Sequence, residues 1–96
     1  MYVFVLFHRG PSYDRLQELA DAHERFVDSL IERRLVLLGG SFARTLDDVD
    51  AGYLLRCESV AAAESLAAQD PYFREGVFRA EAVEWRLVGI DPRAIE

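Results

Sequence analysis

The residues best suited to proton transfer in this chain are a histidine and an aspartate, His23 and Asp70. His23 lies three positions after Ala20 and three before Phe26, on the apolar stripe of an amphipathic segment. An imidazole on that stripe points toward the core, where an unpaired polar group costs about 1–3 kcal/mol. The position therefore predicts a hydrogen-bonding partner for His23.

Asp70 is the candidate partner, because it follows a second predicted helix that packs on the same sheet face as the first. A carboxylate on one imidazole nitrogen fixes the tautomer and leaves the other nitrogen free for proton transfer. The spacing also allows a structural alternative. In that alternative a backbone carbonyl satisfies His23, and Asp70 only caps the helical turn that begins at Pro71.

Other residues with chemical potential have simpler interpretations. Cys57 is the only cysteine, which excludes an internal disulfide and a cysteine metal site, and we expect it to be a small buried hydrophobe. His8 follows the first predicted strand and reads as a solvated loop histidine. His8 and His23 alone make a poor metal site, although carboxylates can complete one. We therefore predict neither a metal nor a cofactor.

The glycine pair Gly39 and Gly40 is typical of a bulge or of close backbone approach beside a pocket. No phosphate-loop or dinucleotide pattern surrounds it. Arg44, shortly after, reads as a surface arginine, with contact to an anionic substrate as the alternative. The serines lack a nucleophile motif, so the residues favour proton transfer over covalent catalysis.

Length and charge limit the possible partners. The 96 residues predict one domain, 1–96, and a formal charge of −6 disfavours nucleic acid and anionic membranes as partners. The opening apolar run at 2–7 is too short to span a membrane and lacks a basic leader. With a single cysteine, we expect a protein of the reducing cytoplasm.

Hydrophobic periodicity and turn residues divide the chain into six main elements. They are strands at 2–7, from 36 toward 42, at 52–57 and at 77–90, with helices from Asp14 to Arg34 and at 60–68. Asp14 and Gln17 resemble a capping box at the start of the first helix. Ser59 is a candidate N-cap of the second helix, and Asp70-Pro71 begins a short extra turn.

The order βαββαβ predicts an α+β fold, a ferredoxin-like sandwich with two helices on one face of a four-stranded antiparallel sheet. The runs 2–7 and 36–38 are apolar without alternation, which predicts that both faces of the sheet are buried. Two helices cover only one face. We therefore expect a second copy of the chain on the other face, in a symmetric homodimer.

Four stretches in matching order resemble the YCII-related (YciI-like) family: 22–30, 35–40, 67–76 and 83–85. The similarity runs from residue 2 to about residue 88, and its most specific part is the Asp-Pro-aromatic segment at 70–72. The resemblance implies a ferredoxin-like fold of the dimeric α+β barrel type. It also implies that His23 and Asp70 match the family's proposed active-site pair. The chain departs from the family at Ser41, where many relatives have proline.

The resemblance does not supply a reaction. Most members have no assigned activity, a related member is a dehydrochlorinase acting on a chlorinated hydroxyquinol, and the fold resembles that of muconolactone isomerases. We expect a homodimer whose pocket binds a small-molecule ligand, with His23 as general acid/base oriented by Asp70. The expected activity is an isomerase or lyase (dehydrochlorinase-like) acting on a small cyclic or aromatic acid or lactone. The candidate substrate contacts are Gly40, Ser41, Tyr72 and Trp85, with packing in the core or at the dimer interface as the alternative for Tyr72 and Trp85. The alternative is a non-catalytic small-molecule-binding or regulatory module.

Overall fold

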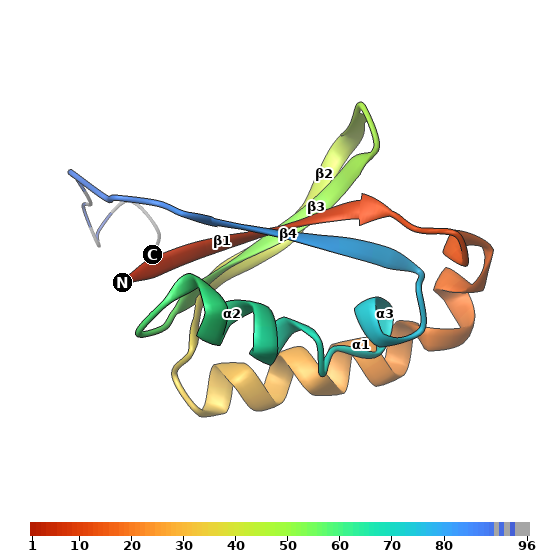
Figure 1. Ribbon diagram of the computed structural model, residues 1–96, viewed down its shortest axis with the longest axis horizontal. Helices are drawn as coiled ribbons and strands as arrows, with labels where there is room; N and C mark the ends of the chain where they lie inside the picture. The colour runs from red at the N-terminus through yellow and green to blue at the C-terminus, as the bar shows by residue number, and fades with distance from the viewer. Residues whose placement is uncertain (90, 92, 94–96) are drawn as a thin grey trace.

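The computed structural model describes residues 1–89, 91 and 93, which form a mixed α+β fold (Figure 1). The elements are β1 (Tyr2–Arg9), a 3-10 turn η1 (Tyr13–Arg15), α1 (Leu16–Glu32), β2 (Val36–Leu46), β3 (Val49–Arg56), α2 (Val60–Ala67), α3 (Pro71–Arg74) and β4 (Phe78–Glu84). This order contains the expected βαββαβ arrangement, with α3 as the predicted extra turn. None of the helices in the described part of the chain is long and apolar enough to cross a membrane.

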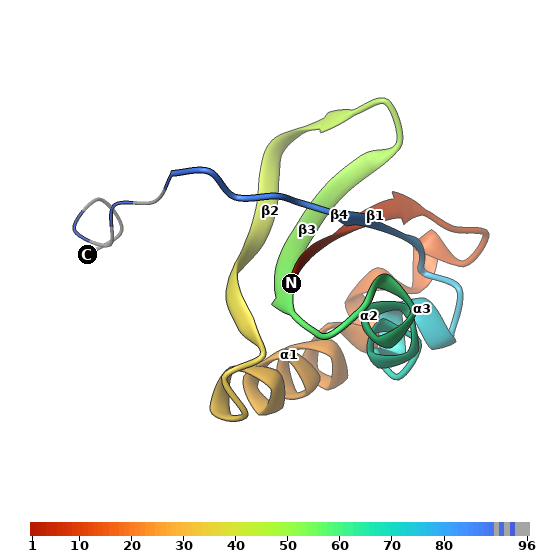
Figure 2. The ribbon, with the colours of Figure 1, turned by 60° about the vertical axis from the view of Figure 1, so that its left-hand side comes forward.

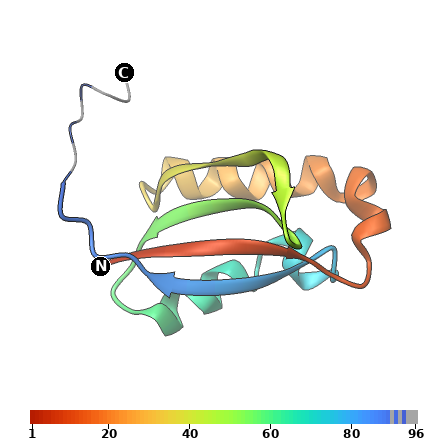
Figure 3. The ribbon, with the colours of Figure 1, turned by 90° about the horizontal axis from the view of Figure 1, so that it is seen from above.

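The four strands form one antiparallel sheet in the order β2-β3-β1-β4. Helices α1, α2 and α3 all lie on one side of it, and Figure 3 looks down on the side that they leave uncovered. The β2–β3 hairpin projects past the other strands (Figure 2). This arrangement is the ferredoxin-like one, and it leaves one face of the sheet without helices.

Alternation along the strands separates the two faces of the sheet. In β1, Val3, Val5 and Phe7 are buried, whereas the residues between them are only partly buried. The buried set packs with Leu30 of α1 and with residues of β3, α2 and β4 to form the core. The protomer therefore builds its core between helices and sheet. The apolar residues of the uncovered face, such as Phe4, lie outside this core.

Two expected boundaries of the first helix are wrong. Asp14 lies inside η1, and neither η1 nor α1 has a side-chain cap, so the predicted capping box does not form. Backbone bonds from Tyr13 N–H to Gly10 O and from Arg15 N–H to Ser12 O shape this entry instead. At the other end α1 stops at Glu32, and Arg34 adopts a left-handed φ of 60° that reverses the chain into β2.

The strand boundaries also differ from expectation. β2 extends to Leu46, past the expected residue 42, and β3 begins at Val49 rather than at 52, so the turn between them is short. His8 belongs to β1 rather than to a loop. β4 ends at Glu84, and the expected strand end at Ile90 and the proline of the tail, Pro92, lie outside the described residues.

Candidate active site

His23 and Asp70 meet between the helices, although 47 positions separate them in the sequence. His23 comes from the middle of α1 and Asp70 from the residue before α3. The Nδ1 atom of His23 lies 2.9 Å from each carboxylate oxygen of Asp70. An ionised carboxylate only accepts hydrogen bonds, so this nitrogen must donate and the neutral imidazole must carry its proton on Nδ1. Nε2 then has the free lone pair, and within the described residues no group is hydrogen-bonded to it.

Asp70 is completely buried and is held by two further donors. The Tyr72 backbone N–H donates to Oδ1 at 2.9 Å, and the Tyr53 hydroxyl donates to Oδ2 at 3.2 Å. The first of these bonds caps α3, whose first residue is Pro71. Three donors compensate the loss of water around the carboxylate, which is what a buried anion requires.

Two aromatic rings fix the plane of the His23 imidazole. The Tyr72 ring stacks on it, with centroids 4.0 Å apart and planes 14° from parallel. Phe7 meets it edge-on at 5.8 Å. The side chain keeps 19% of its surface exposed. His23 is therefore held on one side by Asp70 and by these rings, while part of it stays open to small molecules.

Tyr53 is a site residue that the sequence analysis missed. It lies in β3 opposite Gly39 of β2, where a Cβ atom on Gly39 would come within 2.9 Å of the Tyr53 Cβ. Phe7 packs against its ring at 5.1 Å. Burial and the nearby Asp70 carboxylate raise the pKa of the Tyr53 hydroxyl, so it remains a donor. Residues 53–55 of β3 are all apolar and buried, so no alternation in the sequence marks Tyr53 as facing the helices.

A pocket of about 1050 Å³ lies between α1 and the β2–β3 hairpin, and His23 forms part of its wall. Three of the four predicted substrate contacts, Gly40, Ser41 and Tyr72, line the same pocket. Trp85 does not. It borders a smaller hollow of about 370 Å³ with Phe4, on the sheet face that the helices leave uncovered. The roles of all four in substrate binding stay predictions.

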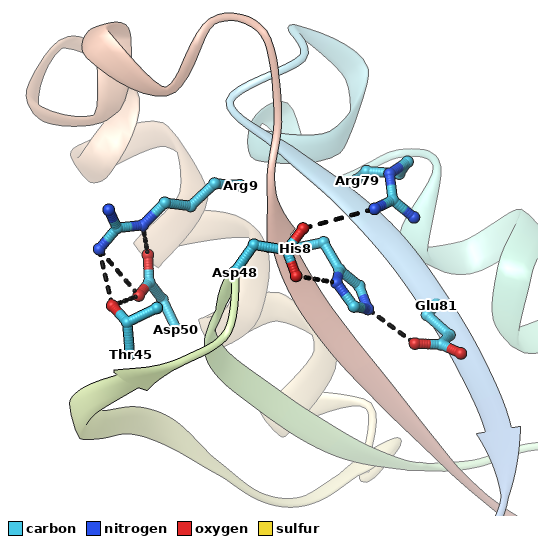
Figure 4. Close-up of polar contacts among 7 residues, drawn as sticks. All are labelled: His8, Arg9, Thr45, Asp48, Asp50, Arg79 and Glu81. Carbon is cyan, nitrogen blue, oxygen red and sulfur yellow. Dashed lines mark hydrogen bonds and ion pairs between the residues drawn. The ribbon is translucent and has the colours of Figure 1, made fainter.

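The far end of the pocket carries an ordered arginine. The Arg9 guanidinium donates to Asp50 at 2.6 and 3.1 Å and to the Thr45 hydroxyl at 2.7 Å (Figure 4). It also lies over the Tyr13 ring, 4.4 Å from the centroid. Arg44 lines the pocket nearby. Among the described residues, no group of three histidine, cysteine or acidic side chains is arranged to hold a metal ion.

Comparison with known proteins shows which family this chain belongs to. The family model of the YCII-related domain matches residues 1–86. The chain belongs to the YCII-related family. No curated protein matches it in sequence. Among solved structures, this YCII-related chain is similar to the 5-chloro-2-hydroxyhydroquinone dehydrochlorinase TftG from Burkholderia phenoliruptrix, in complex with 2,5-dihydroxybenzoquinone. The match has a TM-score of 0.71 and 19% identity, and it covers 90% of this chain and 94% of that one.

Proposed function

We propose that this YCII-related chain is an acid/base protein whose His23 moves a proton on a small cyclic or aromatic acid or lactone. The supporting observation is the asymmetry of the imidazole. Nδ1 is committed to the buried Asp70, whereas His23 itself lines the large pocket. A base must be within reach of the proton it removes, and Nε2 is the nitrogen left for that task.

The proposed step needs only residues of this chain. Nε2 accepts a proton from a C–H or O–H bond of the ligand, and the Asp70 carboxylate stabilises the resulting imidazolium. Returning the proton to another atom completes an isomerisation. If the ligand instead expels a leaving group as its proton moves to Nε2, the result is an elimination, and the imidazolium then releases the proton to water. The similar structure named above is a dehydrochlorinase in complex with a quinone, which favours elimination from an oxygenated ring.

The first test needs no substrate. Nitrogen-15 NMR of the neutral His23 imidazole distinguishes its two tautomers, and we expect the proton on Nδ1, the form that is less common in solution. A neutral imidazole with its proton on Nε2 would have no lone pair to offer the pocket and would contradict the proposal. His8, the second histidine, is assigned with a His8→Gln variant.

The second test uses a panel of small aromatic acids, hydroxyquinones and lactones. Ligands that raise the melting temperature are then examined for consumption. We expect His23→Gln to bind such a ligand and to lose about 100-fold or more in turnover, the usual effect of removing a general base. Asp21→Asn, on the exposed side of the same helix, is the matched control. Full turnover in His23→Gln would refute the assignment.

A second candidate function is a non-catalytic binding or regulatory module. One observation favours it: Asp70 already has a structural role, because it caps α3 and pairs with Tyr53. In that case the panel yields ligands that stabilise the protein, by about 2.7 kcal/mol at a hundred times Kd, and none that is consumed.

We also propose that a second copy of the chain covers the helix-free face of the sheet, and that the protein works in the cytoplasm as this homodimer. The dimer proposal rests on the exposed apolar side chains of that face, with Leu38 at 48%, Val83 at 47% and Trp85 at 48% of their surface. A symmetric pairing of such faces buries both at once. Light scattering at micromolar concentration should give twice the chain mass of 10.9 kDa. The cytoplasmic assignment rests on the single cysteine, Cys57.

A further inference from the structure

A second cluster of titratable side chains surrounds His8, outside the candidate active site. His8 is in β1, one residue after the core residue Phe7, so its side chain points to the helix-free face of the sheet. Its Nδ1 lies 2.7 Å from Asp48 and its Nε2 lies 2.7 Å from Glu81 (Figure 4). Only 15% of the His8 side chain is exposed.

The geometry of this cluster matches a doubly protonated His8. Ionised carboxylates only accept hydrogen bonds, so both nitrogens of His8 must donate, and only the imidazolium carries two N–H groups. A neutral imidazole would keep one bond and turn a lone pair toward the other carboxylate. The two carboxylates raise the pKa of His8 above its ordinary value of 6.5, and His8 in turn lowers the pKa of Asp48.

Arg79 is the other cation of the cluster. It comes from β4 and lies 3.6 Å from Asp48. It therefore balances one carboxylate, while Glu81, also from β4, depends on His8. The groups that face His8 are thus Asp48 from the turn and Arg79 and Glu81 from β4. Loss of the proton from His8 leaves a net negative cluster.

His8 joins two parts of the fold that have few other links. Asp48 lies in the turn between β2 and β3, whereas Glu81 lies on the far side of β1 in β4. Strand pairing in the hairpin is interrupted between Ser41 and Leu46, and Asp47 has a left-handed φ of 56°. The tip of the hairpin is consequently attached mainly through its contacts with His8, Arg9 and Arg79.

The same hairpin is a wall of the large pocket. Residues 42–45 and Asp50 line it together with His23. Arg9 holds Asp50 and Thr45 from the helix side of the sheet, and its backbone N–H donates to Asp48 O at 2.8 Å. His8 holds Asp48 from the opposite face. Consecutive residues of β1 thus fasten the hairpin from both sides.

We propose that His8, Asp48 and Glu81 form a proton-operated latch that fixes the β2–β3 hairpin as a wall of the pocket. The latch is closed while His8 is an imidazolium and loosens when His8 becomes neutral. Its contribution to stability is complete below the unfolded-state pKa of histidine and is lost as the pH rises through the raised pKa of the folded state. At the acid end it is lost as the pH falls through the lowered pKa of Asp48.

The test compares amide hydrogen exchange in the hairpin with the titration of His8, both followed by NMR. After correction for the intrinsic effect of pH on exchange, we expect protection of the residues that pair on either side of the interruption, 41 with 51 and 46 with 49, to fall about tenfold as His8 loses its proton. That is the size expected for one hydrogen bond to a charged group. Residues of the core strands, such as Val5, report any global loss of structure.

Two variants on β4 make the test decisive. Glu81→Gln removes one of the charges that favour the imidazolium, so the His8 titration and the change in hairpin protection should move together to lower pH. Glu84→Gln, on the same strand and without a contact to His8, should move neither. Hairpin protection that ignores the His8 titration, or that responds equally to both variants, would overturn the latch. No step of this test measures turnover. The latch can therefore be refuted while the proposed acid/base function stands, and that function can be refuted while the latch stands.

Discussion

The two histidines of the chain differ in how many carboxylates surround them. Asp70 occupies one nitrogen of His23, whereas Asp48 and Glu81 occupy both nitrogens of His8. An imidazole needs one unoccupied nitrogen to take up and deliver a proton. At the residue scale, His23 is therefore the histidine suited to acid/base chemistry, and His8 is suited to fastening strands.

Tyr53→Phe tests how much the third donor on Asp70 contributes. The change removes one hydroxyl and leaves Oδ2 of a fully buried carboxylate with one partner fewer. We expect a loss of about 1–3 kcal/mol in the free energy of unfolding, measured with denaturant. Tyr2→Phe, on the helix-free face, is the matched control and should stay within about 0.5 kcal/mol of the parent. Equal effects of the two changes would show that the Tyr53 hydroxyl is not a significant partner of Asp70.

Sequence reasoning reached the proximity of His23 and Asp70 because helical periodicity and the Asp-Pro turn are local signals. It did not reach Tyr53, whose role depends on strand register and on the missing side chain at Gly39. It also took His8 for a loop residue, since Asp48 and Glu81 lie 40 and 73 positions away. Contacts that depend on pairing between distant strands leave little local trace.

At the scale of elements, α3 is small but fixed at both ends. Asp70 caps its start, and Gly76, with φ of 75°, turns the chain into β4. The loop after β1 is attached to this turn, because Gly10 N–H donates to Val77 O at 2.9 Å and Ser12 N–H donates to Gly76 O at 2.8 Å. The position of the carboxylate therefore depends on how closely two loops approach.

Gly10→Ala tests that approach. A Cβ atom on Gly10 would lie 2.3 Å from the backbone oxygen of Gly76, so one of the two loops must move. We expect a loss of about 1–3 kcal/mol in the free energy of unfolding, as for other overpacked sites, and a changed NMR signal for His23. Gly40→Ala is the control for stability, since nothing lies within 4 Å of the added carbon. A Gly10→Ala protein as stable as the parent would contradict the close packing of the loops.

The boundaries of the elements could also be predicted from the sequence only where a local signal sets them. Ser59 was correctly expected to cap α2, and its hydroxyl accepts from Ala62 N–H at 3.0 Å. The predicted cap at Asp14 fails because backbone bonds within the preceding loop form a 3-10 turn there. The expected strand at 77–90 was too long, because apolar composition continues past Glu84, where regular strand pairing with β1 stops.

At the scale of the whole molecule, one face of the sheet packs against the helices to form the core, and the helices leave the other face uncovered. Val83→Lys tests the proposed dimer, because it places a charge on the uncovered face at a position that is 47% exposed in the protomer. We expect the mass measured by light scattering to fall by half with little change in protomer folding. Ile31→Lys, at an exposed position of α1, should leave the mass unchanged. A parent protein that is already monomeric would contradict the dimer.

The projecting hairpin also bears on how the pocket of this protein can change. Most of β2 is exposed, so its side chains contribute to the pocket wall and little to the core. Substitutions at exposed sites usually cost little stability. Random variation over residues 40–44 should therefore alter ligand preference while the unfolding transition stays in place. The His23–Asp70 end, where Asp70 is completely buried, should tolerate very few substitutions. One half of the pocket is free to diversify while the other keeps the His23–Asp70 pair in place.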